Sequence, residues 1–212
     1  FAGEFPDLAA KYKLPTYPFD QGAANALLDK AGWVRGADGI RAKGGEKLSF
    51  EYGTTRNATR QAIQALVQAD LKAVGMDAVT VNYPQGFFAP DGPIATGKTK
   101  LAQFAYSQSN YSTFDVYSED ELWTPEDIGK QNRQQYKNSK VTEMNRAMNA
   151  EIDRKKYAEL GAAIQVEMMN DVAVIPMVQR ANIEVYRNTL QNRKVTNSSA
   201  SQWWNLQQWY FK

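Results

Sequence analysis

A strand–helix–strand pattern between residues 48 and 83 constrains the fold of this chain more than any other feature. The segments LSFEYGT and DAVTVNY at its two ends alternate apolar and polar side chains, and this period of two predicts a strand at each end. Between them, from Asn57 to Gly75, apolar residues recur at helical spacing. This order of elements predicts a right-handed βαβ crossover, so the chain is expected to adopt an α/β fold.

Helix start and stop signals predict further helices on either side of this pattern. A short helix is expected over about 20–31, with Asp20 as its N-cap. In LWTPED, Thr124 is placed to cap another helix whose first residue is proline. Apolar spacing then predicts one helix that includes 141–152 and a second that begins at Asp153, with Ile152 and Tyr157 placed as a hydrophobic staple.

The remaining strands are predicted from apolar and β-branched runs. One is expected at 101–106, after a loop over 84–100 that is rich in glycine and proline. Two more are expected at VAVIPMVQ (172–179) and IEVYR (183–187), with Pro176 directing the first of these to an edge or a bulge.

Composition excludes several kinds of protein. The chain has no cysteine and no histidine, which removes disulfides, thiolate chemistry and the commonest base and metal ligand near neutral pH, and no cofactor is predicted. Its net charge is +2 and it has no run of five or six like charges, so no nucleic-acid partner is expected. No apolar stretch is long enough to span a membrane. The first 15 residues do not form a signal peptide, so an exported protein would contain this chain in mature form or as a piece.

One segment, GPIATGKT at 92–99, matches the phosphate-loop pattern of nucleotide-binding proteins. That loop must follow a buried strand directly and open into a helix whose N-terminus meets the phosphates. Here Gly92 comes nine residues after Tyr83, the end of the preceding predicted strand, and the residues that follow the motif also predict a strand. The match is therefore interpreted as a chance one.

A group of acidic residues has two interpretations. Paired carboxylates could serve glycoside hydrolysis or bind calcium, whereas acids around a helix start also interact favourably with the helix dipole without any ligand. The second interpretation is favoured. The residues are Glu119, Asp120, Glu121, Glu126 and Asp127.

The predicted strand at 101–106 runs into neutral polar residues, and this change marks the candidate binding site. One aromatic residue and a few hydrogen-bonding groups are typical of the rim of a ligand cleft. A plain surface loop is the alternative, and composition alone favours it. The candidate residues are Tyr106, Ser107, Gln108, Ser109 and Asn110.

The motifs YPFDQGAANALLDKAGW, DGIR, LKAVGM, YKNSKVTEMNRAM and DVAVIPMV, in their order and spacing, resemble the C-terminal part of the family 5 extracellular solute-binding proteins. These are the dipeptide, oligopeptide and nickel binders of ABC importers, and the resemblance runs along essentially the whole chain. It implies a periplasmic-binding-protein-like lobe of the class II type, with a mixed β-sheet flanked by helices.

The resemblance also implies a domain organisation, because members of the family are considerably longer than 212 residues. Residues 1–16 would be the incoming linker from a missing N-terminal lobe. Residues 17–179 would form the second lobe, and residues 180–212 would return to pack on the first lobe.

In the family, the strand matching LAQFAYS delivers an aromatic residue and then an acid into the cleft. The aromatic maps to Tyr106, which would form a stacking wall, while Ser107, Ser109 and Asn110 would donate or accept hydrogen bonds. Strand alternation would turn Gln108 away. The acid, which pairs with the peptide's amino terminus in peptide binders, maps near Ser109, and a neutral hydroxyl gives no charge-assisted bond to an ammonium group. This departure counts against ordinary peptides as the solute.

The resemblance implies a binding protein rather than an enzyme. It would capture a peptide-like or other small polar solute in an interlobe cleft and deliver it to the permease subunits of an ABC transporter. Its location would be extracytoplasmic, in the periplasm or at the outer face of the cell membrane, as a free protein or a lipoprotein. Two alternatives are a ligand-sensing module of a regulator and a hydrolase that uses carboxylates such as Asp115 and Glu119.

Overall fold

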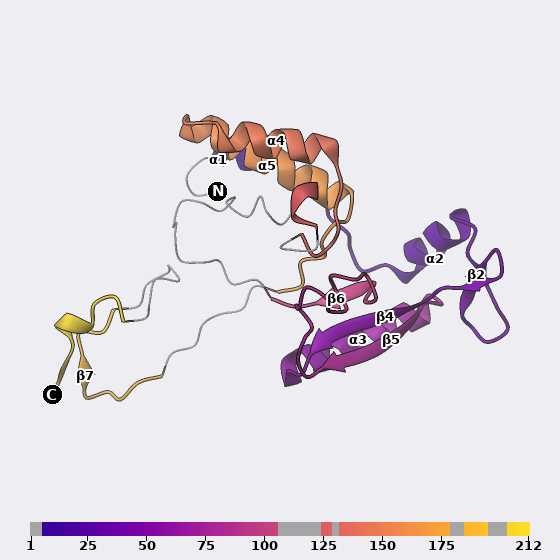
Figure 1. Cartoon of the computed structure of the whole chain (residues 1–212), viewed down its shortest axis with the longest axis horizontal. Helices are drawn as coiled ribbons and strands as arrows, with labels where there is room; N and C mark the ends of the chain where they lie inside the picture. The colour runs from indigo at the N-terminus through magenta and orange to yellow at the C-terminus, as the bar shows by residue number, and fades with distance from the viewer. Residues whose placement is uncertain (1–5, 106–123, 129–131, 179–184, 195–202) are drawn as a thin grey trace. The chain divides into compact units, whose positions relative to one another are not determined.

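The computed structural model describes residues 6–105, 124–128, 132–178, 185–194 and 203–212 (Figure 1). These residues belong to two compact units. The first unit includes 14–105 and the second includes 6–13 and 139–178. Among the described helices, none combines the length and the hydrophobicity needed to cross a lipid bilayer.

The centre of the first unit is a three-stranded parallel sheet with the strand order β5-β4-β6 (Figure 1). In register, Tyr52 of β4 lies opposite Thr80 of β5 and Leu101 of β6. The predicted strand–helix–strand unit with parallel strands is confirmed. Its elements are β4 (Ser49–Thr55), α3 (Ala58–Ala73) and β5 (Asp77–Tyr83), and the third strand is β6 (Leu101–Gln103).

Helix α3 packs against β4 and β5 (Figure 1). Asn57 caps its N-terminus by accepting a hydrogen bond from the backbone N–H of Arg60, 3.1 Å away. The side-chain amides of Gln64 and Gln68 donate to backbone carbonyls of β4 and β5, each over 2.7 Å. These bonds join the helix to both strands, so the helix and the sheet form one layered core.

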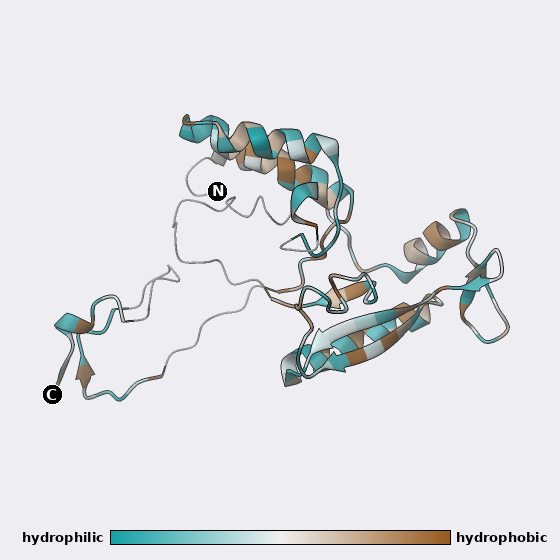
Figure 2. Ribbon diagram, in the orientation of Figure 1, coloured by the Kyte–Doolittle hydropathy of each residue, from teal (hydrophilic) through white to brown (hydrophobic). Residues whose placement is uncertain are grey.

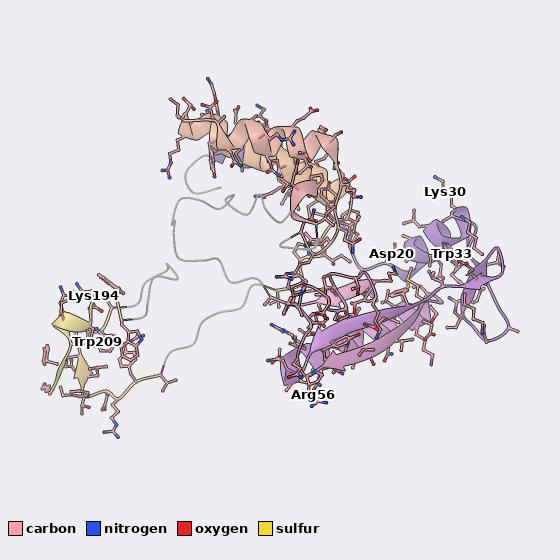
Figure 3. All side chains as sticks on the ribbon, in the orientation of Figure 1. Asp20, Lys30, Trp33, Arg56, Lys194 and Trp209 are labelled. Carbon is pink, nitrogen blue, oxygen red and sulfur yellow. The ribbon has the colours of Figure 1, made fainter. Side chains whose placement is uncertain are left out.

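The predicted helix at 20–31 is confirmed as α2 (Gln21–Lys30). The side chain of Asp20 caps it by accepting from the backbone N–H of Ala23 over 2.8 Å (Figure 3). A small antiparallel sheet follows in the order β1-β2-β3. Its strands are β1 (Val34–Arg35), β2 (Arg41–Lys43) and β3 (Glu46–Lys47).

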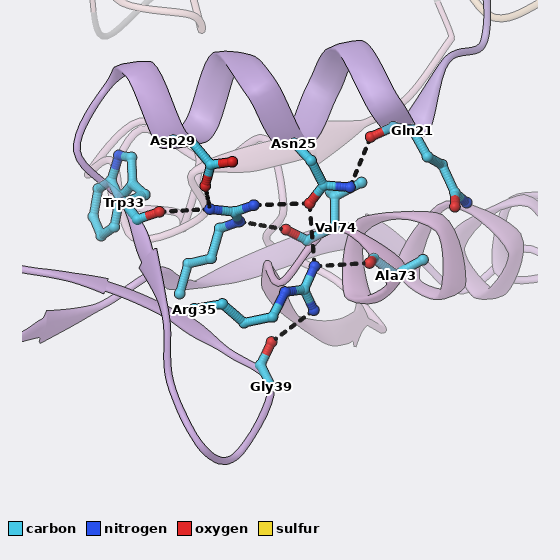
Figure 4. A network of polar contacts seen from close by, with 9 residues as sticks. Gln21, Asn25, Asp29, Trp33, Arg35, Gly39, Ala73 and Val74 are labelled. Carbon is cyan, nitrogen blue, oxygen red and sulfur yellow. Dashed lines mark hydrogen bonds and ion pairs between the residues drawn. The ribbon is translucent and has the colours of Figure 1, made fainter.

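Arg41 connects this small sheet to α2 and to the end of α3. Figure 4 labels its partners Asn25, Asp29, Trp33 and Val74. Its guanidinium donates to the backbone carbonyls of Val74 and Trp33, at 2.8 and 2.5 Å. It also donates to the side chains of Asp29 and Asn25, at 2.5 and 2.8 Å. A buried charge is tolerated only when it is paired and hydrogen-bonded, and these four partners meet that requirement.

The second unit contains two helices that pack on each other, α4 (Ser139–Asn149) and α5 (Arg154–Asn170), and the short helix α1 (Pro6–Lys11). Figure 2 shows apolar and polar residues alternating along α4 and α5, as expected of helices with one buried face. Helix α1 packs on α5. The buried apolar residues of these helices are Leu8, Val141, Met148, Ala158, Ala162, Ile164 and Met168.

The predicted hydrophobic staple between Ile152 and Tyr157 is wrong, because Ile152 is 100% exposed. Ile152 also lies outside α4, whereas the sequence predicts a helix that includes it. Polar contacts on both sides of Ile152 end one helix and begin the next. The carboxylate of Glu151 accepts from the backbone N–H of Asp153 over 2.8 Å, and the carboxylate of Asp153 accepts from the backbone N–H of Lys156 and so caps α5. The predicted start of the second helix at Asp153 is confirmed.

Two predicted strands and one predicted helix do not form as expected in the described residues. Residues 172–178 and 185–187 form no strand there. A strand needs a hydrogen-bonded neighbour, and Pro176 lacks an N–H donor. The helix expected at LWTPED is only a three-residue 3-10 helix, η2 (Pro125–Asp127), and the side chain of Thr124 makes no capping bond there.

The C-terminal residues form a small hairpin around Asn205, which is completely buried. The Asn205 side chain donates to the carbonyl of Asn192 over 2.7 Å and accepts from the indole N–H of Trp209 over 2.8 Å. Figure 3 labels Trp209 and Lys194 in this segment. The elements are β7 (Leu190–Gln191), η3 (Leu206–Gln208) and β8 (Tyr210–Phe211).

Candidate functional site

The predicted binding residues lie outside the described residues, so their placement stays a prediction. They are Tyr106, Ser107, Gln108, Ser109 and Asn110. The acids Asp115, Glu119, Asp120 and Glu121 lie outside as well. The described residues continue to Ala105, two residues beyond the end of β6. The structure therefore includes the part of the chain that leads directly to the predicted site.

That approach is the edge of the sheet where the parallel strands end. Strands β4, β5 and β6 end at Thr55, Tyr83 and Gln103. In open sheets with parallel strands, ligands bind beyond the carboxyl ends of the strands. The chain therefore enters the predicted binding segment from the edge at which an α/β protein places its ligand.

Hydrogen bonds from β4 fix the end of β6. The Thr54 hydroxyl donates to the backbone carbonyl of Gln103 over 2.7 Å, and the Tyr52 hydroxyl donates to the Gln103 side-chain oxygen over 2.8 Å. Burial raises the pKa of Tyr52, so its hydroxyl is protonated and able to donate at neutral pH. The last residue of the strand is thus held through both its main chain and its side chain.

Four aromatic rings connect the end of β5 to the residue after β6, and we name Tyr83, Phe87, Phe88 and Phe104 the aromatic ladder. Tyr83 stacks on Phe87 with ring centroids 5.5 Å apart. Phe88 makes edge contacts with Phe87 at 5.0 Å and with Phe104 at 5.4 Å. These separations are those of attractive aromatic pairs. Phe87 is 2% exposed and Phe88 is 40% exposed, so one ring anchors the ladder and another faces solvent.

Cations lie over two rings of the ladder. The guanidinium of Arg133 lies 5.0 Å from the centroid of Phe88 and donates to the Phe88 carbonyl over 3.3 Å. The ammonium of Lys98 lies 6.0 Å from the centroid of Tyr83. Both distances are within the range of cation–π attraction, which adds to the restraint on the ladder.

The GPIATGKT segment has a structural role where the chain enters β6. The hydroxyl of Thr99 donates to the carboxylate of Glu51. Strand β6, and not a helix, begins at Leu101. The prediction that a strand follows the motif is confirmed. Over the described residues up to Ala105 the motif opens into no helix whose N-terminus could meet a phosphate, which agrees with the interpretation as a chance match.

The sequence predicts only an irregular loop at 84–100, and this prediction misses both the aromatic ladder and the role of Glu51. The adjacent pair Phe87 and Phe88, inside a segment rich in glycine and proline, is the available signal, because exposed loops rarely carry two phenylalanines without packing them. Within the described residues, no group of three or more acidic, histidine or cysteine side chains is placed to hold a metal ion.

The sequence matches one family of known proteins. Residues 1–127 match the family described as bacterial extracellular solute-binding proteins, family 5 Middle. No curated protein matches the sequence significantly.

Solved structures of low sequence identity share the fold. The oligopeptide-binding protein AppA from Bacillus subtilis, in complex with a nonapeptide, has 19% identity and a TM-score of 0.73, with 94% of this chain and 39% of that chain covered. NikZ from Campylobacter jejuni, in complex with Ni(L-His), has 15% identity and a TM-score of 0.72, with 93% and 40% covered. An oligopeptide-binding protein from Thermus thermophilus, complexed with a pentapeptide, has 23% identity and a TM-score of 0.62, with 76% and 30% covered. The chain thus spans at most about two fifths of the length of these proteins.

Proposed function

Because the chain belongs to the bacterial extracellular solute-binding proteins of family 5, we propose that it forms part of a protein that captures a peptide-like or other small polar solute for an ABC importer. The solute binds beyond the carboxyl ends of the parallel strands, with Tyr106 as a stacking wall. The hydroxyl and amide groups of Ser107, Ser109 and Asn110 orient it, and Gln108 contributes less.

The observation that carries this proposal is the aromatic ladder at the carboxyl edge of the sheet. Its last ring, Phe104, lies two positions before Tyr106 in the chain, so a line of aromatic side chains leads into the predicted binding segment. Aromatic walls with a few neutral hydrogen-bonding groups are typical of sites that hold small organic solutes.

The proposed mechanism is binding and release. The solute settles between this part of the protein and the remaining part, hinge closure sequesters it, and the closed form is presented to permease subunits. This process takes place outside the cytoplasm, in the periplasm or at the outer face of the membrane. The similar structures solved with a nonapeptide and with Ni(L-His) name two ligand classes to test first.

Gentle purification of the full-length protein, followed by mass spectrometry of the small molecules that it releases, tests the proposal. We expect one dominant solute. Equilibrium dialysis against a mixture of synthetic di- to pentapeptides shows whether peptides are among the solutes that the protein retains. Tyr106→Ala should weaken retention of the solute at least about fivefold, since an aromatic stacking contact contributes about 1 kcal/mol beyond the area that it buries. Phe19→Ala, at an exposed aromatic outside the site, is the matched control. The proposal would be contradicted if the purified protein released no solute and also retained none of the peptides.

A further inference from the structure

Glu51 of β4 lies at the centre of a polar cluster that joins loop 84–100 to the sheet. The hydroxyl of Tyr83 donates to Glu51 Oε1 over 2.6 Å, and the hydroxyl of Thr99 donates to the same oxygen. The ammonium of Lys98 lies 4.0 Å from Oε2. Tyr83 immediately precedes the loop, and Lys98 and Thr99 lie near its end, so one carboxylate holds both ends of the loop.

Between these ends, the loop is a compact piece of structure. The side chains of Phe87 and Ile94 are buried, and the hydroxyl of Thr96 donates to the carbonyl of Gly92 over 2.9 Å. A Cβ atom at Gly92 would lie 2.3 Å from the carbonyl oxygen of Gly86, so the loop closes tightly on itself. A loop packed in this way moves as a unit, and its attachment points therefore set the position of the rings it carries.

The hydroxyl groups of Tyr83 and Thr99 are donors that match the acceptor oxygens of the Glu51 carboxylate. Hydrogen bonds from hydroxyls to a carboxylate are charge-assisted and stronger than those between neutral groups. Burial, followed by the hydrogen bond to Glu51, raises the pKa of Tyr83, which keeps its hydroxyl protonated as a donor. The Glu51 side chain is only 14% exposed, and the three partners offset the cost of its burial.

We infer that Glu51 is a positioning residue for solute selection: by holding both ends of loop 84–100 it fixes Phe88 against Phe104 and so favours solutes that carry an aromatic side chain. This inference rests on the proposed function. Phe88 is the exposed ring of the ladder, and a solute ring would contact the part of it that Arg133, Phe87 and Phe104 leave exposed. Glu51 acts through Tyr83 and Thr99 and has no contact of its own with the solute.

The test uses the full-length protein and two sets of synthetic tetrapeptides that are identical except for phenylalanine or alanine at one position. Equilibrium dialysis with mass spectrometry measures the retention of each set, well below the unfolding temperature. We expect the wild type to prefer the phenylalanine set, and Glu51→Gln to reduce that preference about tenfold. Tyr83→Phe and Thr99→Val each remove one hydroxyl donor while keeping the shape of the side chain, and each should reduce the preference in part.

Ser49→Ala is the matched control, because it removes a hydrogen bond to Asp77 at the start of β4 and β5 that does not involve the Glu51 carboxylate. It should leave the preference unchanged. A lower unfolding temperature of Glu51→Gln with an unchanged preference would mean a purely structural role and would overturn the inference. A wild type that retains both sets equally also overturns it while the proposed function stands. A wild type that retains neither set overturns the inference, and the proposed function is then decided by whether the gently purified protein releases another solute.

Discussion

Arg41 and Asp29 form an ion pair whose two side chains differ greatly in exposure. The Nη1 and Oδ1 atoms are 2.5 Å apart, yet Arg41 is 3% exposed and Asp29 is 67% exposed. Water around the carboxylate screens the attraction, so the pair itself contributes little. The larger contribution comes from the bonds that the buried guanidinium donates to the carbonyls of Val74 and Trp33 (Figure 4).

Substitution at the two partners should therefore have unequal effects. Arg41→Met should lower the free energy of unfolding by about 2–4 kcal/mol, because it takes the guanidinium donors away from these carbonyls. Asp29→Asn should lower it by less than about 1 kcal/mol, because the site is exposed and the amide oxygen still accepts. Urea unfolding measures both values. Equal losses would show that the ion pair, and not the backbone bonds, dominates.

Local signals in the sequence predict the parts of the fold that local chemistry determines. Asp20 and Asp153 cap the helices that the sequence predicts after them, and the alternation in β4 and β5 identifies the parallel strands. The Arg41 network is not predictable in this way, because Arg41 bonds to Val74, 33 positions along the chain. Periodicity and capping rules describe neighbours within a few residues and contain no information about such a contact.

The candidate site is predictable only in part, for the same reason. Residue types point to the segment after β6, whereas the aromatic ladder depends on the folding of loop 84–100 between Tyr83 and Phe104. The strand expected at 172–179 is wrong over its described part because β-branched residues form strands only when a neighbouring strand completes their hydrogen bonds.

Gly53 allows the loop to approach β4. A Cβ atom there would lie 2.6 Å from Thr99 Oγ1, 2.8 Å from Thr99 Cγ2 and 3.2 Å from the Phe87 ring. Gly53→Ala should therefore lower the free energy of unfolding by about 1–3 kcal/mol. The double variant Gly53→Ala/Thr99→Ala should lose less than the sum of the two single variants, since it removes the clashing atoms. Denaturant unfolding of all four proteins tests this, and strict additivity would contradict it.

The contact between α1 and α5 should weaken in acid. Lys155 Nζ lies 2.7 Å from Asp7 Oδ2, and this hydrogen bond is the main cause that lowers the pKa of Asp7 below its ordinary value of 3.8. A lowered carboxyl pKa stabilises the folded state above pH 3.8, and that stabilisation is lost as the pH falls through the folded pKa. The same pairing raises the pKa of Lys155, so its contribution is present below pH 10.5 and is lost only at higher pH.

Hydrogen exchange of the backbone amides of α1, measured as a function of pH, tests this loss of stabilisation. Wild type should protect α1 better than Asp7→Asn at about pH 6, and the two proteins should converge as the pH falls below 3.8. Asp70→Asn, at an exposed position of α3, is the control and should follow the wild type throughout. A difference between wild type and Asp7→Asn that persists unchanged into strong acid would contradict the prediction.

Asn205 should be indispensable to the C-terminal hairpin, because its side chain satisfies two groups at once. Asn205→Ala leaves the indole N–H of Trp209 and the carbonyl of Asn192 without this partner, which should destabilise the hairpin by about 2–3 kcal/mol. The indole N–H resonance of Trp209 reports the loss: it should move in Asn205→Ala and stay near the wild-type position in the exposed control Gln207→Ala. An unmoved resonance in Asn205→Ala would show that other contacts hold the hairpin.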